Sequence, residues 1–496
     1  MAASQMTGVL RTAVDAARQF WDIVGPGGKL HPQYFLENRG HLVVESLLLG
    51  IIVYLFLQQA FKPKPRGDDP LSDKEMDALV AEWRPEPLVP RMEEAERPRE
   101  RVVTAVHGHH AIVDGKRVLN LASANFLNFG GMPEPMEAAR ATVARYGVGS
   151  CGPRGFYGTI DVHLQLEAHL AEFMGCPICT IFSFDIATIA SVIPACANRK
   201  DIIIMDERCN YAVQQGVLLS RASVHSFKHN DMEDLQRVLE KVEAKERADK
   251  KPLCRKLIIV EGIFATTGDI PPLDEVFAIK ERYKYRLLVD ESLSFGVLGP
   301  NGRGCCEQFG LTAGDVEVIC ASMSGTLGSI GGFCVGDPAV VEHQRLAGSG
   351  YVFSASLPPF LGTAADEALA LLRDRGPMLL PRLRHICSTA RAQLEKVPGI
   401  LVSGGPLSTG NSPVVHLTLA PAVAERVGHQ AFALISRMAE RMFDCDGIMV
   451  SVPLYSCLEK MKTAPSLRIF LSAAMTDEEV SGLAAAVRAA AKEILP

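Results

Sequence analysis

The middle of the chain alternates short apolar runs with longer segments of helical periodicity. The runs at 202–206, 256–260 and 286–290 are almost wholly aliphatic, and helical patterns at 231–240 and 273–283 lie between them. Short apolar runs separated by helices are typical of a parallel sheet that is buried on both faces. We therefore predict an α/β fold with a mainly parallel sheet covered by helices.

The last quarter of the chain has a different pattern. Ala- and Leu-rich helical stretches at 361–373 and 480–494 flank short apolar runs at 414–419 and 467–471. This mixture predicts a smaller α+β domain. We therefore divide the body of the protein into a large domain over residues 101–360 and a small C-terminal domain over residues 361–496.

A strongly apolar stretch lies near the N-terminus. Residues 42–57 are apolar except for Glu45 and Ser46, and a basic, proline-broken segment follows at 61–66. At ~1.5 Å per residue the stretch nearly crosses a ~30 Å hydrocarbon core, so we predict a transmembrane helix over residues 41–58, with a buried core helix as the alternative.

The segments on either side of this stretch are more polar. Residues 1–40 mix apolar and basic positions at helical spacing, which predicts an amphipathic segment on a membrane surface or, equally, a plain packing helix. Residues 59–100 are rich in proline and charge and predict a linker.

Composition excludes some classes of function. The 496 residues carry a formal net charge of -6, which offers no basic field for nucleic acid, so we expect no nucleic-acid partner. The 13 cysteines are odd in number and lie in apolar stretches, which indicates reduced thiols. Cys176 and Cys179 have zinc-knuckle spacing, but no second pair with matching spacing follows. We therefore predict buried thiols here and no metal site.

Three acids end apolar runs of the predicted sheet: Asp206, Glu261 and Asp290. Ligands of open α/β sheets gather beyond the carboxyl ends of the strands. A carboxylate there can keep the pyridinium nitrogen of pyridoxal phosphate protonated. For an isolated aspartate, however, a capping or salt-bridging role is the better interpretation.

The surroundings of Asp290 resemble the α-oxoamine synthase family. The sequence LVDESLSFGVLG at 288–299, followed by NGRG at 301–304, is similar to that family's strand and glycine-rich turn. EGIF at 261–264 and SIGGF at 329–333 resemble two further family segments. The resemblance covers roughly residues 100–496 and implies a fold-type I, aminotransferase-like body of a pyridoxal-phosphate enzyme that joins amino acids to acyl-CoA. Such enzymes are dimers with active sites at the subunit interface.

The family's cofactor-binding residues are nevertheless missing. Gly325 stands where the family has the lysine that binds the cofactor covalently. Leu293 and Ala265 replace a histidine and a serine, and Asn210 replaces the histidine that stacks on the ring. Of this set only Asp290 remains. The resemblance therefore implies a degenerate site with no catalytic residue and no cofactor bound covalently by this chain.

Within the family, this combination resembles the non-catalytic first subunits of serine palmitoyltransferase. The segments that carry the likeness lie at 82–90, 146–159 and 350–359. The resemblance implies a lysine-bearing catalytic partner subunit that holds pyridoxal phosphate, further small activating and membrane regulatory subunits, and contact with membrane lipid. It also implies a single-pass protein of the endoplasmic reticulum membrane with a cytosolic body. The complex would condense L-serine with palmitoyl-CoA to 3-ketodihydrosphingosine, the first step of sphingolipid synthesis.

Two further features follow from the resemblance. The glycine-rich loop at 146–159 should cross the subunit interface near the partner's active site, and its candidate contact residues are Cys151, Gly152, Arg154, Phe156 and Tyr157. Arg468 resembles the family arginine that binds the substrate carboxylate, and here we expect it to be vestigial or structural.

Two other hypotheses remain open. The chain could be catalytic through another lysine, for instance Lys228 or Lys256, although neither lies in the glycine-rich segment. It could instead be a membrane scaffold or lipid sensor that does not assist catalysis.

Overall fold

The computed structural model describes residues 18, 39–57, 72–85, 87–88, 100–249, 252–312, 314–408, 410–455, 459 and 463–496. The chain separates into two units, Met1–Pro98 and Arg99–Pro496. The described part of the first unit contains helices α3 (Arg39–Leu57) and α4 (Asp73–Glu82). Helix α4 lies in the predicted linker, and a capping box between Ser72 and Glu75 begins it.

Helix α3 occupies the region for which we predicted a transmembrane helix. Among the described residues, no helix is long and apolar enough to cross a membrane, so that prediction is not supported. The helix begins at Arg39 and its sequence includes Glu45, so the stretch from Ser46 to Leu57 that is free of charge is only about 18 Å long, against a ~30 Å hydrocarbon core. The amphipathic segment predicted for residues 1–40 lies almost wholly outside the described residues.

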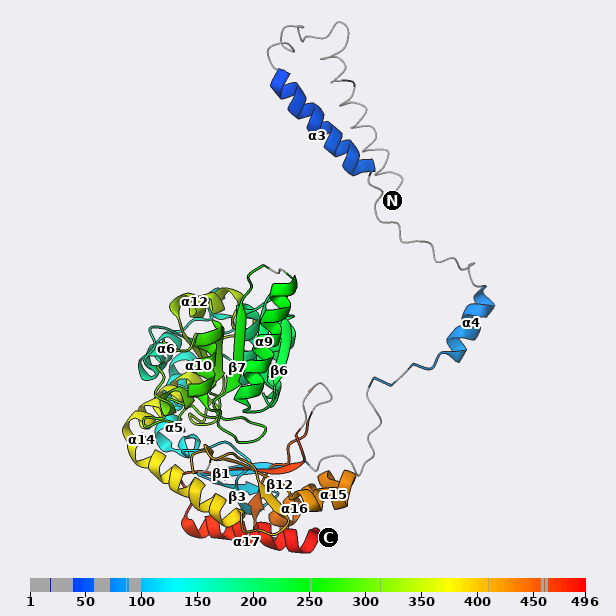
Figure 1. Cartoon of the computed structure of the whole chain (residues 1–496). Coiled ribbons are helices and arrows are strands. Elements are labelled where there is room, and N and C mark those ends of the chain that lie inside the picture. The colour runs from blue at the N-terminus through cyan, green and yellow to red at the C-terminus, as the bar shows by residue number, and fades with distance from the viewer. Residues whose placement is uncertain are drawn as a thin grey trace. The chain divides into compact units, whose positions relative to one another are not determined.

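A seven-stranded sheet forms the centre of the second unit, within the residues described (Figure 1). Its order is β4-β10-β9-β8-β7-β5-β6; β10 is antiparallel to both of its neighbours, and all other adjacent pairs are parallel. The predicted mainly parallel sheet is confirmed. Strands β5, β7, β8 and β9 are buried along nearly their whole length, which explains their aliphatic sequences. The strands are β4 (Cys179–Phe182), β5 (Ile202–Asp206), β6 (Ser223–Phe227), β7 (Lys256–Glu261), β8 (Arg286–Asp290), β9 (Val318–Ser322) and β10 (Gly332–Gly336).

Helices connect these strands, because successive parallel strands need a crossover. Helices α6, α7, α9, α10 and α12 contact strands of the sheet, and α8 packs against α7. The helices of this region are α5 (Pro133–Tyr146), α6 (Asp161–Met174), α7 (Asp185–Cys196), α8 (Tyr211–Ser220), α9 (Met232–Asp249), α10 (Leu273–Tyr283), α11 (Cys305–Gln308), α12 (Pro338–Ala347) and α13 (Ser349–Val352), with short turns η2 (Phe129–Gly131) and η3 (Arg154–Gly158).

The C-terminal part is built on two smaller sheets. Strands β11 (Ile400–Val402), β12 (Val414–Leu419) and β14 (Ser466–Phe470) form an antiparallel sheet. The first strands of the body, β1 (Val103–His107), β2 (His110–Val113) and β3 (Lys116–Asn120), form the other sheet with β13 (Ile448–Met449). The helices here are α15 (Pro421–Val427), α16 (Ala431–Asp446) and α17 (Asp477–Ile494), with turn η4 (Gly428–Gln430). The beginning and the end of the body are therefore joined by strand pairing.

Helix α14 (Pro359–Leu394) connects the two regions of the body. It contacts α5 and α6 beside the large sheet and α17 in the C-terminal part, and Figure 1 shows it running along one side of the body. The predicted boundary between residues 360 and 361 falls near its start. The division into two domains stays a prediction, because residues from Arg99 onward form one compact unit.

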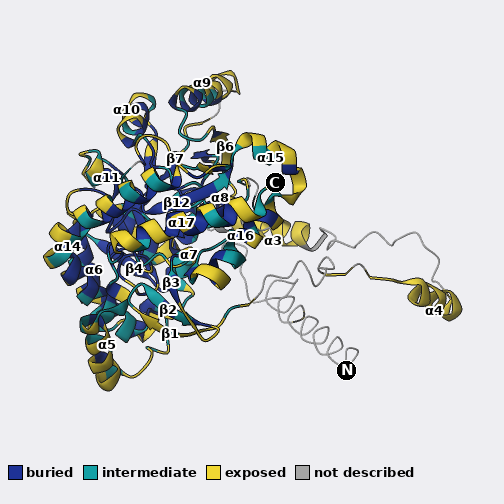
Figure 2. Cartoon of the chain, turned by 90° about the horizontal axis from the view of Figure 1, so that it is seen from below, coloured by how far each residue is buried: buried dark blue, intermediate teal, exposed yellow. Residues whose placement is uncertain are grey.

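One large hydrophobic cluster runs through both regions of the body. Figure 2 shows the buried residues in its interior, while helices such as α9 and α15 have exposed outer faces. The twelve described cysteines are free, as predicted, and most are buried or partly buried. Burial raises the pKa of the Cys176 thiol to about 11 and that of Cys179 further, so both stay neutral thiols in this environment.

A largely buried cluster of one histidine and two aspartates links the large sheet to the C-terminal part. The Nδ1 of His229 lies 2.9 Å from Asp206 at the end of β5, and its Nε2 lies 3.1 Å from Asp269. Asp269 also accepts a hydrogen bond from the backbone N–H of Gly405. Burial alone would lower the pKa of His229, but the hydrogen bonds and charges of the two aspartates outweigh it and raise that pKa to about 9. Asp206 therefore has the salt-bridging role that we preferred for an isolated strand-end aspartate.

We predict that this cluster stabilises the protein in a pH-dependent way. The pKa of His229 is raised above its ordinary value of 6.5, so its contribution is complete below pH 6.5 and is lost as the pH rises through about 9. His229→Ala should therefore lower the free energy of unfolding by about 3 kcal/mol at about pH 6, and by much less at about pH 10. Urea denaturation at both pH values measures this, with the exposed His429→Ala as control. An equal loss at both pH values would contradict the charged state of His229.

Candidate functional site

A cavity of about 450 Å³ lies at the carboxyl ends of strands β7 and β8. It is the place where open α/β sheets bind their ligands. The structure brings together around it all six of the residues that we assigned to the degenerate cofactor site and to the vestigial arginine: Asn210, Ala265, Asp290, Leu293, Gly325 and Arg468.

Two buried carboxyl groups lie at the floor of this cavity. Glu261 and Asp290 end the neighbouring strands β7 and β8 and are register partners. Burial raises the pKa of both groups, and the nearby Asp290 raises that of Glu261 further. Two acids at paired positions of neighbouring strands resist being ionised at the same time, because their negative charges repel each other. We therefore expect the pair to retain a proton that either carboxyl group alone in water would have lost.

Asn210 occupies the space between these acids. Its Nδ2 donates to Asp290 at 3.2 Å, and its backbone N–H donates to Glu261 at 2.5 Å. Its Oδ1 accepts from the backbone N–H groups of Ala212 and Val213 and so caps helix α8. The other oxygen of Asp290 accepts from the backbone and hydroxyl of Ser292. Both oxygens of Asp290 are thus hydrogen-bonded by neutral groups of this chain.

No amine lies where the family has its lysine. A Cβ at Gly325 would lie 3.4 Å from the carbonyl oxygen of Ala124 and from the ring of Phe126, in ordinary van der Waals contact. No lysine is found among the described residues that line the cavity. Leu293 packs against the hydrophobic core, and Ala265 offers its carbonyl oxygen to His416 at 3.1 Å. These residues do not fit a covalently held pyridoxal phosphate.

The two lysines of the alternative hypothesis lie elsewhere. Lys256 begins β7, whereas the cavity lies at the other end of that strand, about 16 Å away at ~3.3 Å per residue. Its Nζ pairs with Glu246 at 2.5 Å. Lys228 follows β6, is exposed and does not line the cavity. Catalysis by either lysine at this site is therefore not supported by the geometry.

Arg468 lies on β14 and lines the cavity. Its Nε donates to the hydroxyl of Ser451 at 3.2 Å, and its guanidinium lies 5.0 Å from the centre of the Phe470 ring. Burial lowers its pKa. No carboxylate of the described residues lies within ion-pair distance of it. The contacts in the structure therefore agree with a structural role.

Several residues of this site were not predicted from the sequence. Asp185 begins α7, three residues after the end of β4, so an extension of the strand-end argument to the following loop could have found it. His416 lies behind Ala265 and also bonds Ser466 at 2.9 Å; burial lowers its pKa to about 4, so it is neutral. No local pattern marks His416, because its two partners come from distant segments. Further lining residues that we did not predict are Ser322, Ser324, Tyr455 and Glu459.

The glycine-rich loop at 146–159 is a separate feature. Its Arg154 is buried and forms a two-pronged ion pair with Glu167, with N–O distances of 2.9 and 3.0 Å. Ser356 donates its backbone N–H to the carbonyl of Gly152 and its hydroxyl to that of Gly158. The charge of Arg154, which we expected to face a partner, is therefore already used to hold the loop.

Part of the rest of the loop is open to solvent. The exposed fraction is 67% for Phe156 and 103% for Tyr157, and Cys151 is exposed as well. Cys151 and Tyr157 have φ values of 57° and 66°, in the left-handed region that non-glycine residues seldom adopt. Gly152 allows the tight fold, since a Cβ there would lie 2.9 Å from the carbonyl of Phe156. The loop thus presents two aromatic rings on a rigid, strained backbone.

Comparisons with known proteins add to this geometry. The family model for aminotransferase class I and II matches residues 116–487. Long chain base biosynthesis protein 1b of Oryza sativa subsp. japonica is 40% identical, with 92% of each chain covered. Long chain base biosynthesis protein 1 of Arabidopsis thaliana is 37% identical, with 92% of each covered. Serine palmitoyltransferase 1 of Saccharomyces cerevisiae is 32% identical over 93% of this chain and 91% of the yeast protein.

Solved structures show the same fold. A Sphingomonas wittichii serine palmitoyltransferase superposes with a TM-score of 0.70 at 25% identity, covering 85% of this chain and 97% of the other. An SPT with a pyridoxal-phosphate internal aldimine also gives a TM-score of 0.70 at 25% identity, over 80% and 93% of the two chains. An internal aldimine requires a lysine of the protein. From the resemblance of the surrounding motif, Gly325 is the residue that we expect at the place of that lysine.

Proposed function

Because this chain belongs to the aminotransferase class I and II family and, within it, to the group of serine palmitoyltransferase 1 and long chain base biosynthesis protein 1, we propose that it is the non-catalytic subunit of a serine palmitoyltransferase. The complex condenses L-serine with palmitoyl-CoA to 3-ketodihydrosphingosine, releasing coenzyme A and carbon dioxide. The chain thus serves an acyltransferase of sphingolipid synthesis without forming bonds to the substrate itself.

The state of Asp290 is the observation that carries this proposal. In an active site of this fold, the acid at the end of this strand faces the cofactor ring. Here Asn210 and Ser292 occupy both of its oxygens, and no described lining residue supplies an amine. Loss of the lysine alone would leave a site ready for the cofactor. Instead, Asp290 forms hydrogen bonds with residues of this chain, as expected of a site that no longer binds the cofactor.

The cofactor of such a complex would then be held by a partner subunit. Condensation of an amino acid with an acyl thioester needs an electron sink for the carbanion, which pyridoxal phosphate supplies when bound. We therefore propose a lysine-bearing catalytic subunit that holds pyridoxal phosphate, together with small activating and membrane regulatory subunits. The exposed rings of Phe156 and Tyr157, on a loop held from behind by Arg154 and Ser356, support a docking surface for the catalytic subunit.

We also propose that the protein works at the endoplasmic reticulum membrane with its body in the cytosol. The exposed fractions of the large apolar side chains that are described for α3 lie between 46% and 64%. Water does not favour such a surface, and lipid would cover it. The proposed substrate, a fatty acyl thioester, and its long-chain product are themselves membrane-associating molecules.

We predict that activity depends on the pair of subunits. The full chain purified alone should show no internal-aldimine absorbance with pyridoxal phosphate and no release of coenzyme A from L-serine and palmitoyl-CoA. The same chain with its lysine-bearing partner should show both, and the partner alone should show much less turnover. An aldimine spectrum from the lone chain would contradict the proposal. Full activity of the partner alone would favour the scaffold or lipid-sensor hypothesis.

We predict that the loop rings bind the partner. The double variant Phe156→Ala with Tyr157→Ala should weaken association with the catalytic subunit about 30-fold, which corresponds to about 2 kcal/mol at an interface hot spot. Circular dichroism and the melting temperature should not change, because both rings are exposed. Phe432→Ala on α16 is the control, since Phe432 is an exposed aromatic residue away from the loop. Equal affinity of the double variant and this control would remove the loop from the interface.

We predict that α3 holds the protein on the membrane. Deletion of residues 39–57 should shift the protein from the membrane fraction to the soluble fraction. Deletion of α4, residues 73–82, is the control, because that helix is short and polar. If the protein without α3 still pellets with membranes, another segment makes the contact.

A further inference from the structure

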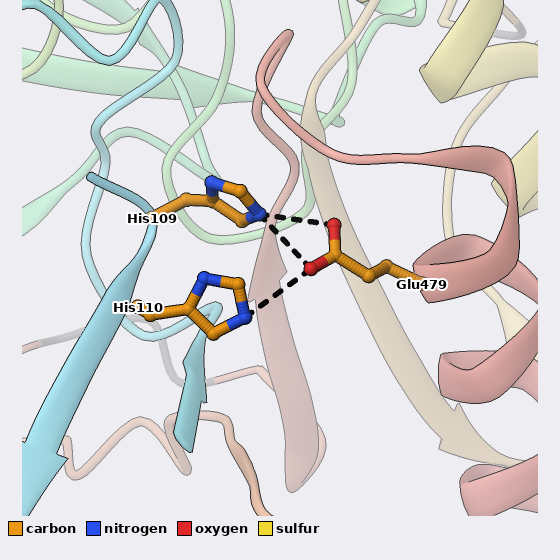
Figure 3. A group of neighbouring side chains, drawn as sticks. All are labelled: His109, His110 and Glu479. Atoms are coloured by element: carbon orange, nitrogen blue, oxygen red, sulfur yellow. Dashed lines mark hydrogen bonds and ion pairs between the residues drawn. The ribbon is translucent and has the colours of Figure 1, made fainter. Parts of the chain in front are cut away.

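A cluster outside the cavity joins the two ends of the body. His109 and His110 lie at the turn between β1 and β2, and Glu479 lies in the first turn of α17. The Nε2 of His109 lies 3.1 and 2.9 Å from the two oxygens of Glu479, and the Nε2 of His110 lies 3.2 Å from one of them (Figure 3). We propose that these three side chains form a binding site for a divalent metal ion of the zinc type.

The donor atoms converge as such a site requires. One nitrogen from each histidine and one carboxylate oxygen all lie within 4.8 Å of one another. Ligands at ~2.0–2.2 Å from a tetrahedral zinc ion lie about 3.3 Å apart. Small rotations of the side chains therefore suffice to place an ion between them. Two imidazoles and a carboxylate are the donors that zinc uses when it keeps a fourth position for water.

The backbone holds both rings on the same side. Neighbouring residues of an extended strand point to opposite faces, yet these two ring centroids lie only 4.4 Å apart. Gly108, with a φ of 62°, makes the turn that lets His109 and His110 face one acid. The arrangement therefore depends on the turn rather than on the strand, and it is available before any ion binds.

The carboxylate is held by a second contact. Glu479 is the third residue of α17 and accepts the backbone N–H of Thr476 at 2.9 Å, while its own N–H donates to the Thr476 hydroxyl at 3.2 Å. Contacts of this kind around a ligand keep it oriented toward a metal. The capping box thus holds the Glu479 carboxylate in place, both as the cap of α17 and as a ligand directed toward the metal ion.

The site is shielded but can be reached. The exposed fractions of the three side chains are 16%, 21% and 23% for His109, His110 and Glu479. Such burial limits competition from water and leaves a path for the ion. Imidazole donors favour zinc, cobalt or nickel over magnesium or calcium, which prefer oxygen ligands. An imidazole binds a metal through a ring nitrogen that carries no proton, so in the bound state the ring proton of each histidine would lie on Nδ1.

The consequence is structural. The ion would fasten the first hairpin of the body to its last helix, across 370 positions of sequence between His109 and Glu479. This inference does not depend on the proposed function, because neither the cavity nor the glycine-rich loop takes part.

Zinc titration of the full chain tests the site. The chain is purified in detergent, stripped with EDTA and alkylated at accessible thiols, and zinc is titrated against a chromophoric chelator. Wild type and His429→Ala, an exposed histidine elsewhere, should each bind one equivalent and gain in melting temperature. The double variant His109→Ala with His110→Ala should lose that equivalent and the gain. Glu479→Gln, which keeps a hydrogen-bonding carbonyl for the cap, should bind at least about tenfold more weakly.

Cobalt gives a second readout. Cobalt(II) in the wild type should show the visible absorption of a tetrahedral site without the near-ultraviolet charge-transfer band of thiolate ligands, and magnesium should not bind. If the double variant loses its circular dichroism spectrum and so is unfolded, the zinc affinity of Glu479→Gln tests the site instead. Absence of zinc binding to the wild type, or equal binding by the wild type and both sets of variants, would overturn the proposal.

Discussion

Two carboxyl groups buried side by side, Glu261 and Asp290, impose the constraint on which the rest of the site depends. Buried acids are costly unless they are protonated, paired with a cation or hydrogen-bonded. Among the described residues no cation lies against this pair, and the chain satisfies it with neutral donors from Asn210, Ala265 and Ser292. Asn210, which caps α8, also donates to Asp290, so one side chain stabilises both the start of this helix and the buried acid.

Other charged groups in the interior of the body are stabilised by ion pairs instead of by neutral donors. His229 lies between two aspartates and keeps its proton, and Arg154 pairs with Glu167 behind the glycine-rich loop. Both pairs join residues of different structural elements and hold the loops between them in place. The body therefore retains the rigid framework of an enzyme of this fold while its own cavity lacks the attachment point for a cofactor. A framework of that kind can position a loop against a partner, which is what the proposed function requires of it.

Much of this protein could be predicted from its sequence because the relevant signals are local. Aliphatic runs of about five residues predict the parallel strands, since only strands buried on both faces lack polar positions. Gly325, Leu293, Ala265 and Asn210 could be assigned from the segments around them, and the fold brings all four to one cavity. The apolar stretch near the N-terminus was the weaker signal, because Glu45 interrupts it and α3 does not meet the length and hydropathy that a membrane span needs.

The sequence by itself determined the class of fold, the free cysteines and the absence of a lysine from the family's motif, because each depends on neighbouring residues or on residue type. Only the tertiary structure decided which groups form hydrogen bonds with the buried acids, that Arg154 forms an ion pair with Glu167, and that His416 contacts the carbonyl oxygen of Ala265. The same is true of His109 and His110, which meet Glu479 only when the first hairpin packs beside the last helix. These contacts span from 13 residues, between Arg154 and Glu167, to 370 residues, between His109 and Glu479. They leave no periodic pattern in the sequence, because only the packing of different elements against each other creates them.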